Sequence, residues 1–370
     1  MASITAYTTK SGRRWQVQWT RPDGRRTRTR GFRTKSEAQA WVEEQGHARR
    51  HGAWVDPADG RTTVSDIGDR WLAAQTHLKP STWRVTEHTW RCYVEPEWGR
   101  YPVGNIRQSD IQAWVSNIDR SASTVRRAHA CLAQVLDAAV ADRLVASNPA
   151  RGVRLPRKAR ARHVYLSMEQ VRMLADECSH HGEIVWVLAT TGLRWGELAG
   201  LQVADIDLDK RRIHVRRAAV AVGSRVEVGE PKTHKRRTVA VPRFVCNMLA
   251  PMLEGRDGGE WVWHRRDGGP LPNLTHGSWF FEARDRLVAR DPDFPAITPH
   301  GLRHVAAGLL VGAGANVKVV QRQLGHASAT MTLDVYADLF DGDLDAVADT
   351  MEDLHSELCE PKVSQIPKSA

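Results

Sequence analysis

Cysteine and tyrosine are both scarce in this chain of 370 residues, which contains five of each. The cysteines are widely separated along the sequence: Cys92, Cys131, Cys178, Cys246 and Cys359. Because none of them forms a CxxC pair, the sequence predicts neither a zinc site nor a disulfide framework. The HExxH motif is missing as well, and we expect no metal and no other cofactor.

Long apolar runs are also lacking. No stretch approaches the length that spans a bilayer, and the first residues, Met1 to Thr5, contain no apolar core of a signal peptide. We therefore expect a cytoplasmic protein that does not contact membranes. Its length and its 41% of hydrophobic residues are sufficient for two or three domains with hydrophobic cores.

Acidic residues are too few to balance the basic ones, and the formal net charge is +10. Residues 1–53 contain twelve Lys or Arg and four acids, and residues 151–162 contain six basic residues and no acid. Residues 341–360, by contrast, contain eight acids and neither Lys nor Arg. The basic excess favours a polyanionic partner for the N-terminal and central parts of the chain.

The N-terminal 55 residues predict a small sheet covered by a helix. Trp15, Val17 and Trp19 alternate with polar residues, and a turn leads to a second short strand at residues 26–30. Thr34-Lys35-Ser36-Glu37 then has the pattern of a capping box, which opens a helix whose apolar side could cover the sheet.

Between residues 61 and 150, apolar residues recur at spacings of three and four, which predicts four amphipathic helices. Their apolar stripes run over residues 64–72, 83–94, 111–118 and 125–144, and Asn148-Pro149 is expected to stop the last helix. We expect the tryptophans on these stripes to be core residues rather than base-stacking residues.

The most informative motifs lie near the C-terminus: His300-Gly301-Leu302-Arg303-His304, then Leu324-Gly325-His326, then Tyr336. Cleaving a phosphodiester without a metal requires a nucleophile, fixed positive charge and proton-transfer groups, and these residue types supply all three. At the start of a helix after Pro299, His300 and Arg303 would share one face. The other four tyrosines have no such motifs nearby, so Tyr336 is the candidate nucleophile.

Two further motifs lie upstream. In the segment 190–198, TTGLRWGEL, Gly192 is expected to end one helix and Arg194 to start the next. Arg194 could also be a surface arginine that merely pairs with Glu197. The sequence Glu230-Pro231-Lys232-Thr233 lies between the alternating stretches 226–228 and 238–241, which predict a β-hairpin with Lys232 at its tip.

Taken in order, Arg194, Lys232, His300-x-x-Arg303, His326 and Tyr336 resemble the tyrosine recombinases, specifically phage-type integrases, whose catalytic domain is shared by type IB topoisomerases. The motifs that carry the resemblance are TGLRxxEL, PKT, HGLRH, LGHAS and a tyrosine ten residues after His326. The resemblance is strong over roughly residues 160–356.

The resemblance implies that Tyr336 attacks the scissile phosphate, leaving a 3′-phosphotyrosyl link and a free 5′-hydroxyl, without ATP. Arg194 and Arg303 would hold the non-bridging oxygens, with His326 as an additional donor. Lys232 would protonate the leaving 5′-oxygen and His300 would accept the tyrosine proton, although the sequence does not separate these two proton-transfer roles. We expect Glu197 to orient Arg194, and His304 to pack or to hydrogen-bond a loop rather than to touch substrate.

The implied architecture is multidomain and mainly α with small β elements. It comprises an arm-type DNA-binding domain of sheet plus helix (1–55), a SAM-like four-helix core-binding domain (61–150), a basic linker (151–164), a mixed α/β catalytic domain (165–356) and a disordered tail (357–370). A capping box at residues 167–170 is expected to open the catalytic domain. We expect the acidic helix at 343–356 to dock on a neighbouring subunit, the alternative being its own domain.

Candidate DNA contacts are basic residues of the first three parts: Arg25, Arg26, Arg28, Arg30, Lys79, Arg84, Arg126, Arg127, Arg154, Arg157 and Lys158. The implied partners are double-stranded DNA with core and arm attachment sites, a homotetramer on synapsed DNA, a host DNA-bending factor and an excisionase. The implied location is the cytoplasm of a bacterial host, in association with the nucleoid.

Three other functions remain open at the level of the sequence. A conjugative-element integrase would share every motif. A type IB-like topoisomerase would relax supercoils without attachment sites, and the arm-like N-terminal unit argues against it. A non-catalytic DNA-binding regulator would retain its activity as the variant Tyr336→Phe, but the complete set of motif residues would then have no purpose.

Overall fold

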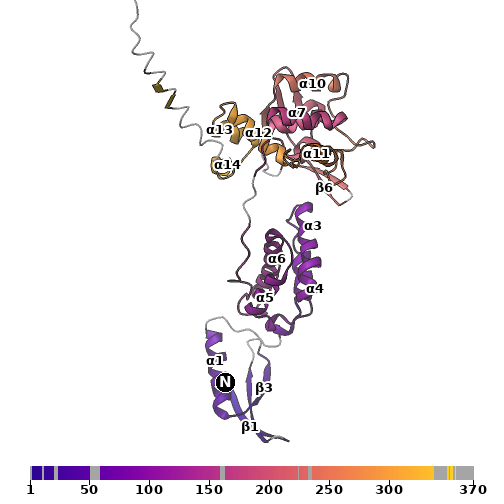
Figure 1. Cartoon of the computed structure of the whole chain (residues 1–370). Coiled ribbons are helices and arrows are strands. Elements are labelled where there is room, and N and C mark those ends of the chain that lie inside the picture. The colour runs from indigo at the N-terminus through magenta and orange to yellow at the C-terminus, as the bar shows by residue number, and fades with distance from the viewer. Residues whose placement is uncertain are drawn as a thin grey trace, which may run out of the picture. The chain divides into compact units, whose positions relative to one another are not determined.

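The computed structural model describes residues 2–10, 12–20, 24–50, 59–158, 163–223, 225–231 and 236–336, and isolated positions at 348–349, 351–352 and 355 (Figure 1). For residues 47–50 only the backbone is described. The chain divides into two units, residues 1–160 and 161–370, and each is described by itself.

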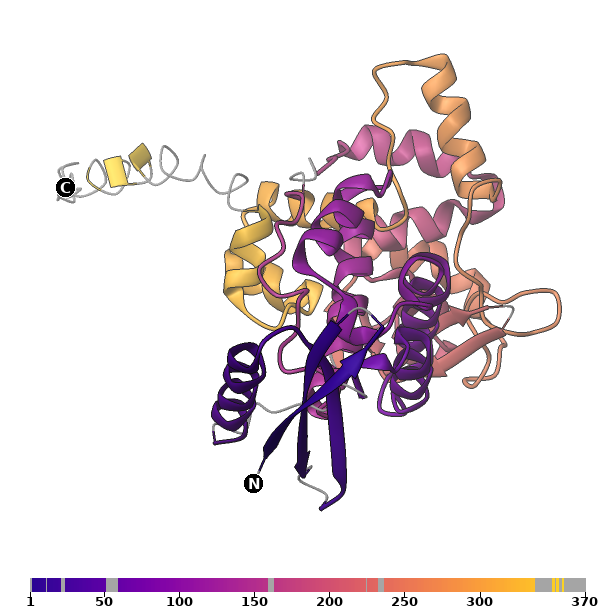
Figure 2. The same ribbon diagram turned by 90° about the horizontal axis from the view of Figure 1, so that it is seen from below.

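The N-terminal sheet has three antiparallel strands in the order β1 (Ser3–Thr9), β2 (Gly12–Thr20) and β3 (Arg26–Phe32), followed by helix α1 (Lys35–Arg50) (Figure 2). The first strand was not foreseen from the sequence. Val17 and Trp19 are buried against Ala38 of α1, as the alternation predicted. At the start of α1, Thr34 Oγ1 accepts the Glu37 amide at 3.1 Å, whereas the Glu37 carboxylate accepts the amide of Arg33 at 2.7 Å. The capping box is therefore present, but the Glu37 side chain accepts from the amide of Arg33 and not from that of the N-cap residue Thr34.

The second part of this unit is a helical bundle. Its elements are η1 (Asp59–Arg61), α2 (Val64–Ala73), α3 (Pro80–Thr89), the π-helical turn η2 (Trp90–Val94), α4 (Glu95–Trp98), η3 (Val103–Asn105), α5 (Gln108–Asn117) and α6 (Ala122–Ala141). The segments α3, η2 and α4 follow without a break and form the second predicted helix. The Glu95 amide bonds the Trp90 carbonyl, five residues back, just before Pro96, which has no N–H to continue the regular ladder. Of the tryptophans on the predicted stripes, Trp90 and Trp114 are buried in the core, and Trp71 and Trp83 are half-buried against it, which confirms their assignment to the core.

The last predicted helix ends earlier than expected, at Ala141 instead of Asn148. Arg143 adopts a left-handed conformation with φ of 59°. The Leu144 amide then bonds the Ala139 carbonyl at 2.8 Å, and the Arg143 amide bonds the Val140 carbonyl at 3.0 Å. These are the two bonds of a Schellman cap, so the helix ends although no glycine marks the position.

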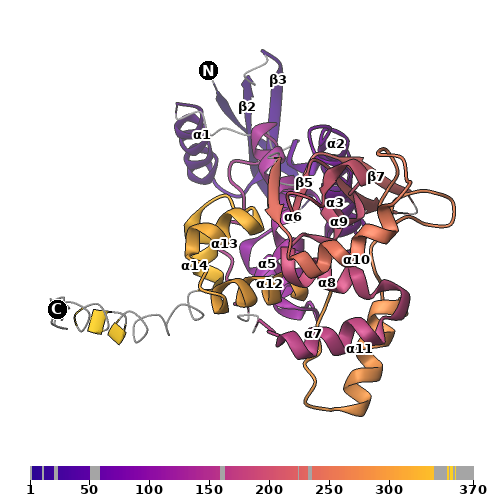
Figure 3. The same cartoon turned by 90° about the horizontal axis from the view of Figure 1, so that it is seen from above.

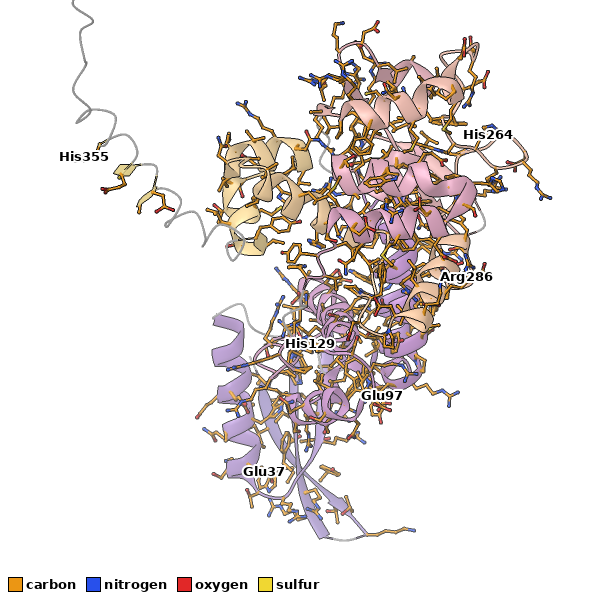
Figure 4. The ribbon with its side chains drawn as sticks, turned by 45° about the horizontal axis from the view of Figure 1, so that its top comes forward. Glu37, Glu97, His129, His264, Arg286 and His355 are labelled. Atoms are coloured by element: carbon orange, nitrogen blue, oxygen red, sulfur yellow. The ribbon has the colours of Figure 1, made fainter. Side chains whose placement is uncertain are left out.

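The first half of the predicted linker is fastened to this bundle. Buried His129 on α6 bonds the Ala150 carbonyl at 3.0 Å (Figure 4), and the Gln112 side chain bonds both the N–H and the carbonyl of Arg154. Arg126 Nη1 donates to the Pro156 carbonyl at 3.2 Å. Residues 159–162, the rest of the basic stretch, lie outside the described residues.

The second unit is mainly helical. Its helices are α7 (Met168–Glu177), η4 (Ser179–His181), α8 (Gly182–Thr191), α9 (Trp195–Ala199), η5 (Val203–Asp205), α10 (Arg243–Leu253), α11 (Trp279–Arg290), α12 (Gly301–Gly312), α13 (Val317–Leu324) and α14 (Ala329–Tyr336). The predicted capping box opens α7, with Ser167 and Gln170 exchanging both bonds. Apolar α8 lies against α7, α10 and α12 (Figure 3), and its Ile184 and Leu188 are fully buried in the main core.

The strands of this unit correct the predicted hairpin. Strand β5 (Arg212–Val215) pairs with β4 (Ile206–Asp207) and β8 (Arg237–Ala240), while β6 (Ala218–Val222) pairs with β7 (Arg225–Gly229). The two predicted strands, β7 and β8, therefore exist but are paired with other strands and not with each other. The reason is a tighter turn upstream, where Gly223 at φ of 66° lets β6 fold back directly onto β7.

Lys232 falls in the connection between β7 and β8 and lies outside the described residues. The same holds for most of the predicted acidic helix 343–356 and for the whole tail 357–370. Among the helices that the structure describes, none is long and apolar enough to cross a membrane.

Candidate active site

The site is built around the junction of α8 and α9. Gly192 caps α8 in a left-handed conformation, φ 68°, and Arg194 lies at the N-terminus of α9, as the sequence predicted. A Cβ atom on Gly192 would lie 2.3 Å from Leu324 Cδ2. Only glycine therefore allows both the turn and the close approach of α13. The junction brings Arg194 next to residues more than a hundred positions later in the chain.

A buried carboxylate holds two arginines at this junction. Glu197 accepts hydrogen bonds from Arg194 Nη1 at 2.9 Å and from Arg237 Nη1 and Nη2 at 2.9 and 2.7 Å. Its Oε2 also accepts the Arg194 amide at 2.9 Å. Burial alone would raise the pKa of Glu197, but the hydrogen bonds and charges of Arg237 and Arg194 outweigh it and lower this pKa to about 2. Glu197 is thus ionised and orients two guanidinium groups.

Arg237 was not foreseen as a site residue. It is the first residue of β8, and its side chain is only 11% exposed. Its Nε donates to the Gln323 carbonyl at 3.4 Å, and the Gln323 side chain bonds both the N–H and the carbonyl of Ala240. Strand β8 is thereby fastened to the end of α13, just before the segment that carries His326.

Arg303 is buried beside this cluster. Its Nη1 donates to the Gly192 carbonyl at 2.5 Å and its Nη2 to the Leu324 carbonyl at 2.7 Å. Burial, and then the positive charge of Arg194, lowers the pKa of Arg303 to about 9, so it remains charged at neutral pH. Two arginines bond the Glu197 carboxylate and Arg303 adds a third positive charge nearby, so the cluster has an excess of positive charge that an anion such as a phosphodiester would neutralise.

Tyr336 ends α14 and is 1% exposed. Its hydroxyl oxygen lies 2.8 Å from Nδ1 of His304, in hydrogen-bonding contact. The His326 ring is stacked nearly parallel to the phenol, with centroids 6.2 Å apart and planes inclined by 12°. Burial raises the pKa of Tyr336 to about 12, which keeps the phenol protonated in this conformation.

His304 packs against a loop residue, His163, as expected, but its ring also bonds the candidate nucleophile, which was not expected. Helical geometry explains this: His304 is one turn beyond His300, on the side of α12 that faces α14. The sequence did not single out His163, whose ring packs against that of His304 with centroids 4.1 Å apart and planes inclined by 31°. His163 belongs to no motif, and the HGLRH motif that contains His304 does not indicate the contact with Tyr336.

His300 lies at the N-cap of α12 and is exposed, with its ring edge-on to that of His304 at 5.5 Å. His326 follows Gly325, which ends α13 at φ of 69°, and its Nδ1 lies 2.9 Å from Thr332 Oγ1. The structure therefore brings together Arg194, Glu197, Arg303, His326 and Tyr336, with His300 at the rim. Lys232 is the one predicted catalytic residue whose place is outside the described part of the chain.

The predicted DNA contacts outside the catalytic motifs lie in the first unit, residues 1–160. Arg26, Arg28 and Arg30 project from one exposed face of β3, opposite the face that α1 covers, and Arg25 just before them is exposed. In register with them on β2 are Gln18, opposite Arg28, and Gln16, opposite Arg30, which the sequence did not single out. In the bundle and the linker, exposed basic residues are Lys79, Arg84, Arg127, Arg154, Arg157 and Lys158, whereas Arg126 is half-buried.

Comparisons with known proteins agree with this geometry. A model described as the phage integrase family matches residues 164–342, and one for the phage integrase central domain matches residues 64–155. The chain belongs to the phage integrase family of tyrosine recombinases. It is a site-specific recombinase that integrates phage DNA.

Its curated relatives include integrases of mycobacteriophages. The integrase of Mycobacterium phage D29 is 29% identical over 350 residues, covering 88% of this chain and 90% of the relative. The integrase of Mycobacterium phage L5 is 29% identical over 324 residues, covering 82% and 84%. These matches extend over most of the recombinase and are not confined to its catalytic motifs.

Solved structures show the same fold. The Tn1549 transposon integrase in complex with circular intermediate DNA has a TM-score of 0.66 and 23% identity, covering 77% of this chain and 100% of that one. A lambda integrase tetramer bound to a Holliday junction has a TM-score of 0.59 and 18% identity, covering 88% and 96%. The likeness confirms a mainly helical, multidomain fold with a small N-terminal sheet.

Proposed function

We propose that Tyr336 is the nucleophile of this recombinase. Its oxygen attacks the scissile phosphorus, the bond from phosphorus to the 5′-oxygen breaks, and a 3′-phosphotyrosyl link remains until a 5′-hydroxyl reverses the step. The observation that carries the proposal is the position of this phenol, in contact with His304 and stacked on His326, beside buried Arg303. None of the other four tyrosines has an HxxR motif and an LGH motif nearby.

Arg194 and Arg303 are proposed to hold the non-bridging oxygens. Both guanidinium groups are fixed by protein oxygens, Arg194 by Glu197 and Arg303 by the Gly192 and Leu324 carbonyls, so little reorganisation is needed when the transition state forms. Each such contact contributes roughly 3 kcal/mol to transition-state stabilisation. Their excess positive charge supports the same role.

His326 is proposed as a further donor to the phosphate. Burial, and then the charge of Arg303, lowers its pKa to about 4, so the ring is neutral near pH 7. If Thr332 donates to Nδ1, the single ring proton lies on Nε2, where it can bond a phosphate oxygen. Lys232 remains the proposed acid for the 5′-oxygen.

We also propose how the protein assembles on DNA. The lambda integrase structure contains a tetramer on a Holliday junction, and by analogy we propose that this chain acts as a homotetramer with residues 343–356 docked on the next subunit. The exposed arginines of β3 would bind arm sites, and the helical bundle would bind core sites, in the bacterial cytoplasm. A host bending factor and an excisionase would set the direction.

The test is to incubate the full-length protein with nicked core-site DNA, without metal or ATP, and to resolve the products on a denaturing gel. We expect a covalent adduct at the 3′-phosphate with the wild type and none with Tyr336→Phe. Tyr101→Phe is the matched control, because Tyr101 is 48% exposed in the helical bundle, and it should form the adduct normally. An adduct that persists in Tyr336→Phe would show that another residue is the nucleophile.

A further inference from the structure

A phenol that attacks phosphorus must lose its proton, and His304 is the residue, among those described, whose side chain lies within hydrogen-bonding distance of this hydroxyl. Its Nδ1 lies 2.8 Å from the Tyr336 hydroxyl oxygen, which is within the range for direct proton transfer. The contact spans 32 residues of sequence and joins α12 to the end of α14. It is therefore set by tertiary packing and not by local chain geometry.

The surroundings of His304 keep its ring in place. The His163 ring packs against it with centroids 4.1 Å apart and planes inclined by 31°, and the His300 ring lies edge-on at 5.5 Å. Arg303, the preceding residue on α12, is fixed by two backbone carbonyls. The imidazole thus has little freedom to turn away from the phenol, which is the arrangement expected for a positioned base.

The protonation states are also suitable. Burial, and then the nearby rings of His163 and His300, lowers the pKa of His304 to about 4, so the ring is neutral and has one nitrogen free to accept a proton. Burial holds the pKa of Tyr336 at about 12. The wide gap between the two values keeps the phenol protonated at rest, so the transfer has to be coupled to attack at phosphorus.

We propose that His304 is the catalytic proton acceptor for Tyr336. The proposal rests on the proposed function of Tyr336 as nucleophile. As the bond from the phenol oxygen to phosphorus forms and the bond to the 5′-oxygen breaks, the phenol proton moves to Nδ1 of His304, whose Nε2 already carries a proton. In the reverse step the same proton returns to the phenol oxygen as it leaves phosphorus. His300, assigned this role by family resemblance, contacts the acceptor ring instead.

The experiment compares single-turnover adduct formation on nicked core-site DNA by wild type, His304→Asn and His300→Asn. Asparagine can still accept a hydrogen bond near the position of Nδ1, but it is not basic. We expect His304→Asn to react roughly 10²- to 10⁴-fold more slowly, the usual contribution of a general base. The control His264→Asn, at an exposed loop histidine of the same unit, should react at the wild-type rate.

A second substitution separates base loss from structural loss. Difluorotyrosine at position 336 lowers the pKa of the nucleophile, so it should restore much of the rate in His304→Asn and little in the wild type. A 5′-phosphorothiolate leaving group should not restore it, because that change replaces the acid and not the base. If His304→Asn fails to keep wild-type thermal unfolding, the same measurements are made with His304→Gln.

The outcomes are distinguishable. A wild-type rate for His304→Asn, or a slow rate that difluorotyrosine does not raise, overturns the proposal. Rescue of His300→Asn in place of His304→Asn assigns the proton to His300. An adduct that persists in Tyr336→Phe contradicts the proposed nucleophile itself. If the adduct is lost in Tyr336→Phe but forms at the wild-type rate in His304→Asn, Tyr336 remains the nucleophile and only the role of His304 is contradicted.

Discussion

Substituting Glu197 by glutamine tests the ion cluster on which the site is built. Among the residues that the structure describes, Glu197 is the one carboxylate bonded to both Arg194 and Arg237, and its side chain is 2% exposed. Its pKa of about 2, against an ordinary value of 4.5, corresponds to about 3 kcal/mol of unfolding free energy. Glutamine keeps the shape but removes the charge, so the variant should lose stability of this order.

The sign of the pH dependence follows from the direction of the shift. Because the pKa of Glu197 is lower in the folded protein than in the unfolded chain, its contribution is fully present above about pH 4.5. It is lost as the pH falls from 4.5 towards 2. The wild type should therefore converge with Glu197→Gln in acid, while the two differ at pH 7.

The assay is urea unfolding of the full chain at pH 7, with hydrogen exchange of α8 and α9 amides to assign the transition to this unit. Adduct formation should fall by roughly 10²-fold as well, because Arg194 loses the group that orients it. Glu169→Gln is the matched control: its bond to Arg172 is equally short, at 2.6 Å, but both side chains are exposed, and no measurable change is expected. Equal losses in both variants, or none in Glu197→Gln, would show that the Glu197 carboxylate does not stabilise the arginine cluster.

Further predictions concern the other unit. Gly68→Ala would place a Cβ 2.1 Å from the fully buried Trp90 ring, and overpacking of this kind should cost about 1–3 kcal/mol in urea unfolding without slowing adduct formation per folded molecule. Replacing Arg26, Arg28 and Arg30 by alanine should reduce the slope of log affinity against log salt for arm-site DNA by roughly 3, with core-site binding unchanged in a gel-shift titration. Equal weakening at both kinds of site would contradict a separate arm-binding face.

Much of this site could be predicted because the chain marks it with local signals. Gly192, between an apolar run and Arg194, predicts the end of one helix and the start of the next, and the structure has the end of α8 and the start of α9 at these positions. The spacing of His300 and Arg303 places both at the start of α12. Such features depend on neighbouring residues alone, so a single sequence is sufficient to find them.

The rest depends on pairing between distant segments. The alternation at 226–228 and 238–241 identified two strands, but their partners are set by the turn at Gly223 and by β5, which competes for β8. Arg237 became a site residue only because Glu197, 40 residues away, accepts its guanidinium. The role of His304 could be recognised only from the position of α14, which brings Tyr336 to its ring. No local pattern encodes these contacts.

The electrostatics of the site suggest why the proposed reaction would wait for DNA. The phenol of Tyr336 is buried and protonated, and His304 beside it is neutral, because burial, and then the neighbouring histidines and Arg303, disfavour an imidazolium. A phosphodiester bound by Arg194 and Arg303 would bring the negative charge that offsets those arginines. On the proposed mechanism, the same anion that receives the nucleophile would also make protonation of His304 less costly. Without DNA, burial and the positive charges of the site keep His304 neutral and the phenol of Tyr336 protonated, so the proton transfer would begin only when the phosphodiester is bound.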